Sequence, residues 1–344
     1  MLRFECDYAE GAHPSILKRL METNMMQTPG YGTDDFCKSA KEKIKKICKN
    51  ENCDIHFVSG GTQANLIVIS SILKPYQGVI SADTGHINTH ETGAIEATGH
   101  KVLAIKSGDG KLKAAQVQEV YEAHINDPNH EHVPAPGMVY ISHPTENGTT
   151  YSKEELSALS DVCKKYNLPL FMDGARLGYG LAAADNTLNM NDIAKLCDIF
   201  YIGGTKVGAL FGEAIVITNP ALKKDFRYNI KQRGAMLAKG RMLGIQFDVL
   251  FEDGLYFEIS KNAVELAMLI KETCQNKGFK FRYESTTNQQ FPILPNSLIE
   301  ELSKKYAFYP WEKYDENNTA VRFCTSWATA KENVQALVED INKF

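Results

Sequence analysis

Between residues 54 and 218, short apolar runs alternate with stretches in which apolar positions recur at helical spacing. Such short runs are typical of buried strands, and apolar positions that repeat about every 3.6 residues are typical of helices packed on a core. The predicted strands are Ile55–Val58, Val79–Ser81, Val102–Ile105, Met138–Ser142, Pro169–Met172, Ile199–Ile202 and Ala214–Thr218. The predicted helices are Gln63–Leu73, Gly93–Thr98, Ala114–Ile125, Lys153–Tyr166 and Met190–Leu196. Because strands that alternate with helices form crossover units, we expect an α/β fold with a mostly parallel seven-stranded sheet covered on both faces.

The chain changes character after residue 227. A basic stretch interrupted by glycines, residues 231–241, leads into a helical run that ends at Leu250. The remainder predicts a helix, two strands at Phe291–Leu294 and Ala320–Cys324, and a last helix. We therefore expect an N-terminal arm over residues 1–30 that packs on the larger domain, a large domain over residues 31–245 and a small C-terminal α+β domain over residues 246–344.

The composition is that of an ordinary soluble globular protein, with 43% hydrophobic and 23% charged residues in a chain of 344. The 38 basic and 42 acidic residues give a net charge of −4, which does not favour nucleic acid or a membrane surface as a partner. No apolar run reaches the roughly 20 residues of a membrane span, and the first residues are too acidic for a secretory signal. The eight cysteines lack the spacing of metal ligands or of a disulfide framework. We expect a cytoplasmic protein with reduced thiols and no resident metal.

Two segments each place an ionisable side chain directly after a predicted strand. Asp173 lies in Phe171-Met-Asp-Gly-Ala-Arg, and Lys206 lies in Ile202-Gly-Gly-Thr-Lys-Val-Gly-Ala. Ligands of parallel sheets gather beyond the carboxyl ends of the strands, so we expect both side chains in one cleft. A lysine in a desolvated pocket can attack a carbonyl carbon, and an aspartate can hold the protonated ring nitrogen of pyridoxal phosphate (PLP). The pair predicts a cofactor enzyme better than it predicts a helix cap and a solvated lysine.

The segment Ser59-Gly60-Gly61-Thr62 connects a predicted strand to a predicted helix. Backbone N–H groups at a helix N-terminus bind phosphate, and glycines let the backbone approach the anion. The segment matches neither the Walker pattern nor the dinucleotide fingerprint, so it indicates an anion site and no more. Thr205 could add a hydroxyl group to this site. Arg176 could bind a carboxylate or a phenolate oxygen, or pair with Asp173.

The turn Gly85-His86-Ile-Asn-Thr-His90-Glu91 contains two histidines and a glutamate. Their intervals do not match a known zinc motif, although a metal site is conceivable. One imidazole could instead stack on a pyridine ring and take part in proton transfer. We assign that position to His86 and a structural role to His90.

Five motifs, in this order, resemble the low-specificity threonine aldolase family, which belongs to the beta-eliminating lyase group of fold-type-I PLP enzymes. They are Ser-Gly-Gly-Thr-x-Ala-Asn from Ser59, Gly-His-Ile-x-x-x-Glu-x-Gly-Ala from Gly85, Asp-Gly-Ala-Arg-Leu from Asp173, Gly-Gly-Thr-Lys from Gly203 and Val-Arg-Phe from Val321. The likeness covers nearly the whole chain, from Gly30-Tyr31-Gly32-x-Asp34 to Arg322. The resemblance implies PLP as cofactor, an amino acid as substrate, and a homodimer or homotetramer whose subunits share active sites.

The resemblance also implies roles for single residues. Lys206 would carry PLP covalently, Asp173 would pair with the ring nitrogen and His86 would stack on the ring. The phosphate would be held by Gly60, Gly61, Thr62 and Thr205. Arg176 and Arg322 would bind the substrate carboxylate, with Arg176 also near the ring hydroxyl. Tyr31 would line the site of a neighbouring subunit, and the basic residues of 231–241 are candidates for reaching a neighbour's phosphate.

Two positions depart from the family pattern. Glu5-Cys6-Asp7 stands where family members carry Arg-Ser-Asp, and Thr145-Glu146-Asn147 stands where they carry a Thr-His pair. We therefore place Cys6 among the substrate-binding residues and Glu146 among the catalytic residues. Glu91, in the turn that carries His86, is also placed among the substrate-binding residues.

The expected reaction is retro-aldol cleavage of a β-hydroxy-α-amino acid of the threonine type to glycine and an aldehyde, with Glu146 or His86 as the base. Elimination of a β-substituent from another amino acid is the alternative, because Glu146 replaces the family's histidine. A binding protein that keeps the fold without catalysis is a further alternative, which Lys206 disfavours. A nicotinamide-dependent oxidoreductase is disfavoured by the glycine spacing of the phosphate loop.

Overall fold

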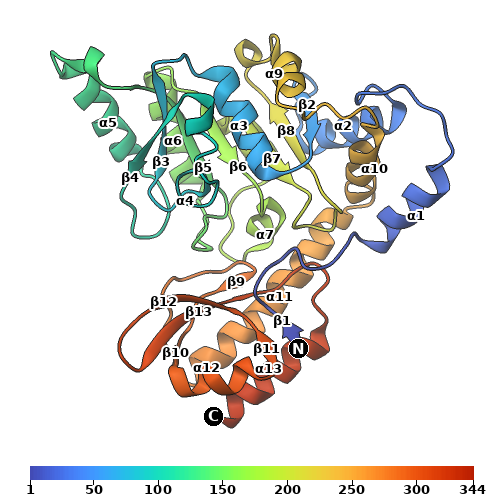
Figure 1. The fold of residues 1–344 in the computed structure, drawn as a ribbon, viewed down its shortest axis with the longest axis vertical. Coiled ribbons are helices and arrows are strands. Elements are labelled where there is room, and N and C mark those ends of the chain that lie inside the picture. The colour runs from blue at the N-terminus through green and yellow to red at the C-terminus, as the bar shows by residue number, and fades with distance from the viewer.

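A seven-stranded sheet forms the centre of the larger of two lobes in the computed structural model, which describes residues 1–344 (Figure 1). Its strands are β2 (Asp54–Val58), β3 (Gln77–Ala82), β4 (Lys101–Ile105), β5 (Ala135–Ser142), β6 (Leu170–Asp173), β7 (Ile199–Gly203) and β8 (Glu213–Ile217). Their spatial order is β2-β8-β7-β6-β5-β3-β4. Strand β8 is antiparallel to both of its neighbours, and every other pair is parallel. The predicted mostly parallel sheet is confirmed.

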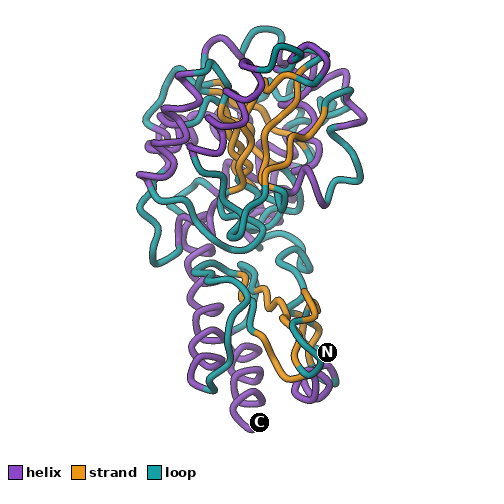
Figure 2. The backbone as a smooth tube through the Cα atoms, turned by 90° about the vertical axis from the view of Figure 1, so that its left-hand side faces the viewer, coloured by secondary structure: helices purple, strands orange, loops and turns teal.

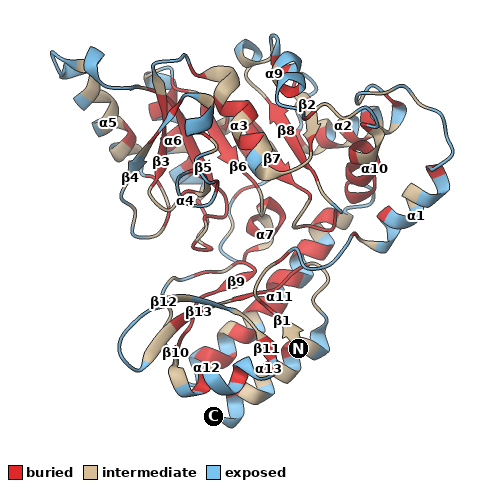
Figure 3. Cartoon of the chain, viewed as in Figure 1, coloured by how far each residue is buried: buried red, intermediate tan, exposed pale blue.

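Helices cover both faces of this sheet because successive strand residues point to opposite sides. In β7, Phe200 and Ile202 belong to a cluster of 42 buried residues on one face, whereas Ile199 and Tyr201 belong to a cluster of 20 on the other. Figure 3 shows buried residues, in red, at the centre of the larger lobe. The helices of this lobe are α2 (Asp35–Cys48), α3 (Gly61–Ile72), α5 (Ala114–Asn126), α6 (Lys153–Lys165), α7 (Leu177–Ala182), α8 (Met190–Leu196), α9 (Phe226–Gln232) and α10 (Arg241–Leu250).

One predicted helix, Gly93–Thr98, is not formed as such. The structure instead has a four-residue helix α4 (His86–Thr89) and a single 3-10 turn at Glu96–Thr98. Thr92 and Gly93 between them have φ angles of 52° and 70°. Left-handed backbone conformations break a right-handed helix, so this segment is a sequence of turns.

The smaller lobe is built on the long helix α11 (Leu255–Asn276). Its other elements are β9 (Gln289–Gln290), β10 (Ile293–Pro295), α12 (Asn296–Ser303), β11 (Tyr306–Ala307), β12 (Tyr309–Lys313), β13 (Asn318–Cys324) and α13 (Lys331–Lys343). Strand β13 pairs antiparallel with β10, β12 and β9. Figure 2 shows α11 and α13 on one side of these strands. Of the predicted strand Phe291–Leu294, only Ile293 and Leu294 lie in a strand, β10, which begins after Pro292, a residue without an N–H group for a ladder.

The N-terminal segment contacts both lobes. Strand β1 (Leu2–Arg3) pairs parallel with β11 of the smaller lobe, and Phe4 is buried in that lobe's core. Helix α1 (Pro14–Thr23) packs against α10 of the larger lobe. The expected boundary at residue 245 falls inside α10, which packs along α2, and the division into domains stays a prediction. No helix combines the length and the apolar composition that crossing a membrane requires.

Candidate active site

Two cavities meet where the parallel strands end. The inner cavity, of about 300 Å³, extends from Lys206 and Asp173 to the first turn of α3. The outer cavity, of about 480 Å³, extends from Lys206 to β12 and β13 of the smaller lobe. Both cavities are lined by Tyr8, His86, Glu146, Arg176 and Lys206. The structure therefore brings most of the sequence-predicted site residues together at the edge of the sheet where ligands are expected.

Asp173, the last residue of β6, is a buried carboxylate with four hydrogen-bond donors around it. Its Oδ1 accepts bonds from the Tyr201 hydroxyl (2.5 Å) and the Ala175 N–H (3.0 Å), and its Oδ2 from the Tyr140 hydroxyl (2.6 Å) and the Asn65 amide (3.1 Å). Burial alone would raise the pKa of Asp173, but the charge of His86 and the hydrogen bonds from Tyr140 and Tyr201 prevail and lower it. Asp173 is therefore held as an anion that faces the inner cavity.

Lys206 follows a turn of small residues after β7. An added Cβ at Gly203 would lie 2.3 Å from the Ala175 carbonyl oxygen, and one at Gly204 would lie 2.7 Å from the Gly212 carbonyl oxygen. Only glycines allow this close packing, which places Lys206 at the junction of the two cavities. Burial and the positive charge of Arg176 lower the pKa of the Lys206 amine. A larger fraction of neutral amine follows, as a nucleophilic lysine requires.

The first turn of α3 forms the far wall of the inner cavity, with Ser59, Gly60, Gly61 and Thr62 in the lining. No side chain caps this helix, so its first N–H groups are open toward the cavity. Thr205 lines the same wall, but its hydroxyl donates to Glu213 Oε1 (2.8 Å) and accepts from the Gly212 N–H (3.0 Å). The segment predicted to bind an anion therefore faces the cavity, and Thr205 also braces the turn before Lys206.

His86 is held by a chain of buried polar groups. Its Nδ1 lies 2.8 Å from Glu91 Oε1, and the same oxygen accepts a bond from the Asn65 amide (2.7 Å). That amide also reaches Asp173, so Asn65 joins the two carboxylates. Burial lowers the pKa of His86, but Glu91 and Asp173 outweigh it and raise the pKa. The Glu91 side chain has no exposed surface and lines neither cavity; it lies behind His86 rather than on the substrate side, where it was expected.

Glu146 lies in the loop after β5 and lines both cavities. Its Oε1 accepts bonds from the Ser142 hydroxyl (2.7 Å) and the backbone N–H of His86 (2.9 Å), whereas its Oε2 is buried without a partner. Burial raises the pKa of Glu146 against the opposing hydrogen bond from Ser142, and the negative charge of Asp173 adds to the increase. A carboxylate with a free oxygen and a raised pKa is suited to accept a proton.

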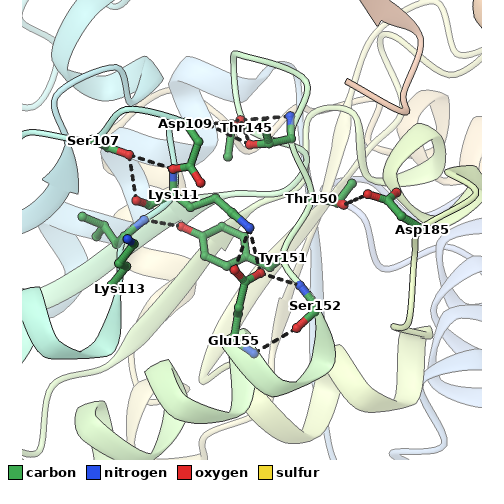
Figure 4. A network of polar contacts seen from close by, with 12 residues as sticks. Ser107, Asp109, Lys111, Lys113, Thr145, Thr150, Tyr151, Ser152, Glu155 and Asp185 are labelled. Atoms are coloured by element: carbon green, nitrogen blue, oxygen red, sulfur yellow. Dashed lines mark hydrogen bonds and ion pairs between the residues drawn. The ribbon is translucent and has the colours of Figure 1, made fainter. Parts of the chain in front are cut away.

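The loop that carries Glu146 is fastened to the loop between β4 and α5 (Figure 4). The Thr149 hydroxyl donates to the Asp109 carbonyl (2.8 Å), and the buried Tyr151 hydroxyl accepts a bond from the Leu112 N–H (2.7 Å). Lys111 reaches Glu155 at the start of α6 (2.6 Å). These contacts hold the backbone around Glu146 without using Glu146 itself.

Arg176 does not pair with Asp173. Its Nε and one terminal nitrogen donate to the two oxygens of Asp7 (2.6 and 3.0 Å), and Asp7 also accepts a bond from the Asn288 amide (2.9 Å). Burial opposes ionisation of Asp7, but the charges of Arg176 and Lys206 prevail and lower its pKa to about 2. The bidentate pair orients the guanidinium toward both cavities.

Arg322 on β13 adds a second guanidinium group to the outer cavity. It donates to the Glu5 carbonyl oxygen (2.8 Å), and its guanidinium carbon lies 5.3 Å and 5.5 Å from the ring centres of Tyr309 and Trp311. Its Nε is buried without a partner. Arg176 and Arg322 therefore offer two cations to one anion in the outer cavity.

Three other residues lie differently from the main group. Tyr31 is 47% exposed and lines a separate small cavity beside α9 and α10. Cys6 is partly buried next to Asp7 but lines neither cavity. His90 lines the outer cavity with its ring centre 5.6 Å from that of His86.

Several residues of the site were missed by the sequence analysis. Tyr140 and Tyr201 lie within apolar strands, where the sequence pattern predicts core residues, although a hydroxyl group in a buried strand needs a partner. Asn65 ends the motif that begins at Ser59, and Glu213 directly precedes the predicted strand Ala214–Thr218, but neither residue was given a role. Asp7 and Tyr8 come from the irregular N-terminal segment, which carries no periodic signal.

Comparison with known proteins agrees with this geometry. The model of the beta-eliminating lyase family matches residues 8–295. A low-specificity L-threonine aldolase from a Pseudomonas species is 31% identical over 98% of this chain and 96% of its own length. A solved structure of Leishmania major threonine aldolase has a TM-score of 0.97 and 45% identity, covering 100% of this chain and 99% of that one.

A Thermus thermophilus aspartate aminotransferase shares the fold, with a TM-score of 0.70 at 13% identity over 100% of this chain and 91% of its own. The expected fold-type-I architecture is thereby confirmed. Together with the five motifs and their meeting at one pair of cavities, these matches place the chain in the beta-eliminating lyase family, among the low-specificity threonine aldolases.

Proposed function

We propose that this enzyme binds PLP in the inner cavity and cleaves a β-hydroxy-α-amino acid of the threonine type into glycine and an aldehyde. One observation carries the proposal: an amine of lowered pKa and a buried carboxylate of lowered pKa line the same cavity as an uncapped helix N-terminus. These three groups match the aldehyde, the ring nitrogen and the phosphate of PLP.

The residues present fit this cofactor. Lys206 would hold it covalently, Asp173 would keep its ring nitrogen protonated, His86 would cover its ring, and the first turn of α3 would bind its phosphate. When bound, PLP supplies an electron-withdrawing ring that accepts the electrons of the bond being broken. Four donors already surround Asp173, so its charge is in place without rearrangement.

Substrate orientation falls to the two arginines. Arg176 is fixed by Asp7, and Arg322 is fixed by the Glu5 carbonyl and two aromatic rings. A carboxylate bound between them would place the rest of a small amino acid near Lys206 and Glu146, which line the same cavity. Holding the reacting groups in this way removes much of the entropic cost of the reaction.

Glu146 is our candidate for the base that removes the β-hydroxyl proton. Its free Oε2 can accept that proton, whereas the raised pKa of His86 favours the protonated imidazole, which cannot. The proton would remain on the Glu146 carboxyl group until it returns to the glycine formed or to water. A positioned base contributes roughly 10²–10⁴-fold to the rate.

The proposal is tested by incubating the purified protein with PLP and L-threonine and identifying the products. A second sample, incubated with PLP alone, is reduced with borohydride, and the modified peptide is mapped. The expected products are glycine and acetaldehyde, and the residue expected to carry the reduced cofactor is Lys206. Lys206→Ala should lose both the attached cofactor and the turnover, whereas Lys195→Ala, which changes an exposed lysine, should keep both. Ammonia with a keto acid would favour β-elimination, and failure to bind PLP would favour a binding protein without catalysis.

The assembly forms part of the proposal. The segment from α1 to Tyr31 exposes Met21, Met25, Met26 and Tyr31, with Tyr228 of α9 also exposed. Contiguous exposed apolar side chains are typical of protein interfaces. We propose that this surface contacts a second copy of the chain and that Tyr31 reaches the site of that copy.

A further inference from the structure

Glu213 takes no part in the proposed reaction, yet its side chain lines the inner cavity and the residue is only 4% exposed. It is the first residue of β8, and the strand register places it opposite Val58 of β2 and Gly203 of β7. Val58 directly precedes the segment that leads into α3, and Gly203 begins the turn that leads to Lys206. Glu213 therefore lies between the phosphate cradle and the covalent attachment point.

The Glu213 carboxyl group is fixed from one side. Oε1 accepts a bond from the Thr205 hydroxyl (2.8 Å), and Oε2 accepts one from the Gly204 N–H (3.1 Å). Each carboxyl oxygen has capacity for a second bond, and neither donor is a charged group. The side chain cannot turn away from the cavity without breaking both bonds, so a bound phosphate must be accommodated beside it.

Two charged groups face Glu213: Lys206, which favours its ionised form, and Asp173, which opposes it. The hydroxyl groups of Tyr201 on β7 and Tyr256 on α11 also face it, but burial raises the pKa of both above any ordinary working pH. The first turn of α3 contributes neither an acidic nor a basic side chain. Burial raises the pKa of Glu213 to about 8, against the opposing effects of Thr205, Lys206 and Gly204.

We propose that Glu213 is a phosphate-binding residue of the PLP site that acts as a neutral carboxylic acid, so that cofactor binding takes up a proton wherever Glu213 is ionised in the free protein. The inference rests on the PLP site proposed above. A phosphate dianion beside a desolvated carboxylate would be repelled, whereas a neutral acid can donate a hydrogen bond to it. The proton comes from water and stays on Glu213 for as long as the phosphate is bound.

Linkage gives the direction of the pH effect. In the free protein Glu213 loses its proton as the pH rises through about 8, and in the complex the phosphate charge keeps the proton bound to a higher pH. The affinity for the cofactor is therefore constant below the pKa that Glu213 has in the free protein, and it falls above that pKa. Between pH 7 and pH 9 it should fall about tenfold, with uptake of close to one proton at the higher pH.

The test measures binding of 4-deoxypyridoxine 5-phosphate to the cofactor-free protein by calorimetry at pH 7 and pH 9, in two buffers of different ionisation enthalpy. This analogue keeps the phosphate and lacks the aldehyde, so attachment to Lys206 does not contribute. The matched variant is Glu213→Gln, which imitates the neutral acid at every pH. Titration of Lys206 affects both proteins, so the ratio of their affinities reports Glu213.

The wild type should bind about tenfold more weakly at pH 9 than Glu213→Gln does, after binding within a few-fold of it at pH 7. At pH 9 the wild type should take up close to one proton more on binding than the variant does. Equal pH dependence of the affinity in the two proteins would overturn the inference. Binding by the wild type at pH 9 without proton uptake would also overturn it, and that result does not need a folded variant. No binding by the wild type at either pH would overturn the PLP site itself.

Discussion

At the scale of single residues, we expect the rate of the proposed cleavage to depend most on the negative charge of Asp173. Asp173→Asn keeps the shape of the side chain and leaves partners for Tyr140 and Tyr201, but it removes the anion that we propose as the partner of the ring nitrogen of PLP. We expect the turnover number to fall by roughly 10²–10³-fold, since electrostatic groups of this kind contribute several kcal/mol to a transition state.

Steady-state kinetics with L-threonine, together with the visible spectrum of the PLP-loaded protein, checks this expectation. Asp54→Asn is the matched control because Asp54 begins β2, is half-exposed and pairs with Lys223 outside the site. Turnover by Asp173→Asn at more than a tenth of the wild-type rate would contradict the assigned role.

Which site residues could be predicted depended on how far apart their partners are in the sequence. Lys206 and Asp173 interrupt apolar runs at strand ends, so a local pattern identifies them. Arg176 finds its partner Asp7 169 positions away, and Asn65 reaches Asp173 across 108 positions. No local pattern records such a pairing, so the position of Arg176 and the link made by Asn65 require the fold.

At the scale of elements, the loop that carries Glu146 depends on Tyr151. Tyr151→Phe would leave the buried Leu112 N–H without its acceptor, which costs about 1–3 kcal/mol of the free energy of unfolding. Tyr166→Phe is the matched control, because the Tyr166 hydroxyl donates to the more exposed Glu122, and its loss should cost less than about 1 kcal/mol. Urea titration of the two variants and the wild type measures the difference. Equal losses would show that the Tyr151 hydroxyl does not brace the loop.

Elements with a clear apolar period were predictable, and elements defined by turns were not. Helix α8 (Met190–Leu196) begins and ends at its predicted residues, and α6 (Lys153–Lys165) ends one residue early. The segment Gly93–Thr98 has helix-compatible residues, but the φ angles of Thr92 and Gly93 are set by how the turn packs around Glu91 and His86. Tertiary contacts there override local preference.

At the scale of the molecule, Asp7 ties the N-terminal segment to Arg176 of the larger lobe and Asn288 of the smaller one. Its pKa falls from 3.8 to about 2 on folding, so its contribution to stability is complete above pH 4 and is lost as the pH falls toward 2. A shift of this size corresponds to about 2 kcal/mol.

The difference in free energy of unfolding between the wild type and Asp7→Asn should therefore shrink by about 2 kcal/mol between pH 5 and pH 2. Urea titrations of both proteins at several pH values in this range measure it. At pH 2 about half of the Asp7 side chains in the folded wild type are protonated, so the two stabilities should approach each other. A difference that stays constant would mean that Asp7 is not held as an anion.

Assembly with a second copy of the chain is our proposed explanation for the position of Tyr31. Its ring is 47% exposed, Lys231 lies 5.0 Å from the ring centre, and its backbone carbonyl accepts a bond from Arg227, yet it lines neither cavity of its own chain. If Tyr31 completes the site of a second copy, a mixed dimer of a Lys206→Ala chain and a Tyr31→Ala chain combines the two defects in a single site. One site of that dimer then carries both defects and the other carries neither.

Each variant should be nearly inactive alone, and equal amounts dissociated and reassociated together should recover about a quarter of the wild-type activity, because half of the dimers are mixed and each has one intact site. Light scattering during size-exclusion chromatography gives the assembly size of every sample. Lys195→Ala in place of Tyr31→Ala is the control, and there the mixture should match the average of its two parents. If the mixture of Lys206→Ala with Tyr31→Ala also gives only that average, or if the wild type is a monomer, Tyr31 acts within its own chain and the exposed surface from α1 to Tyr31 has another purpose.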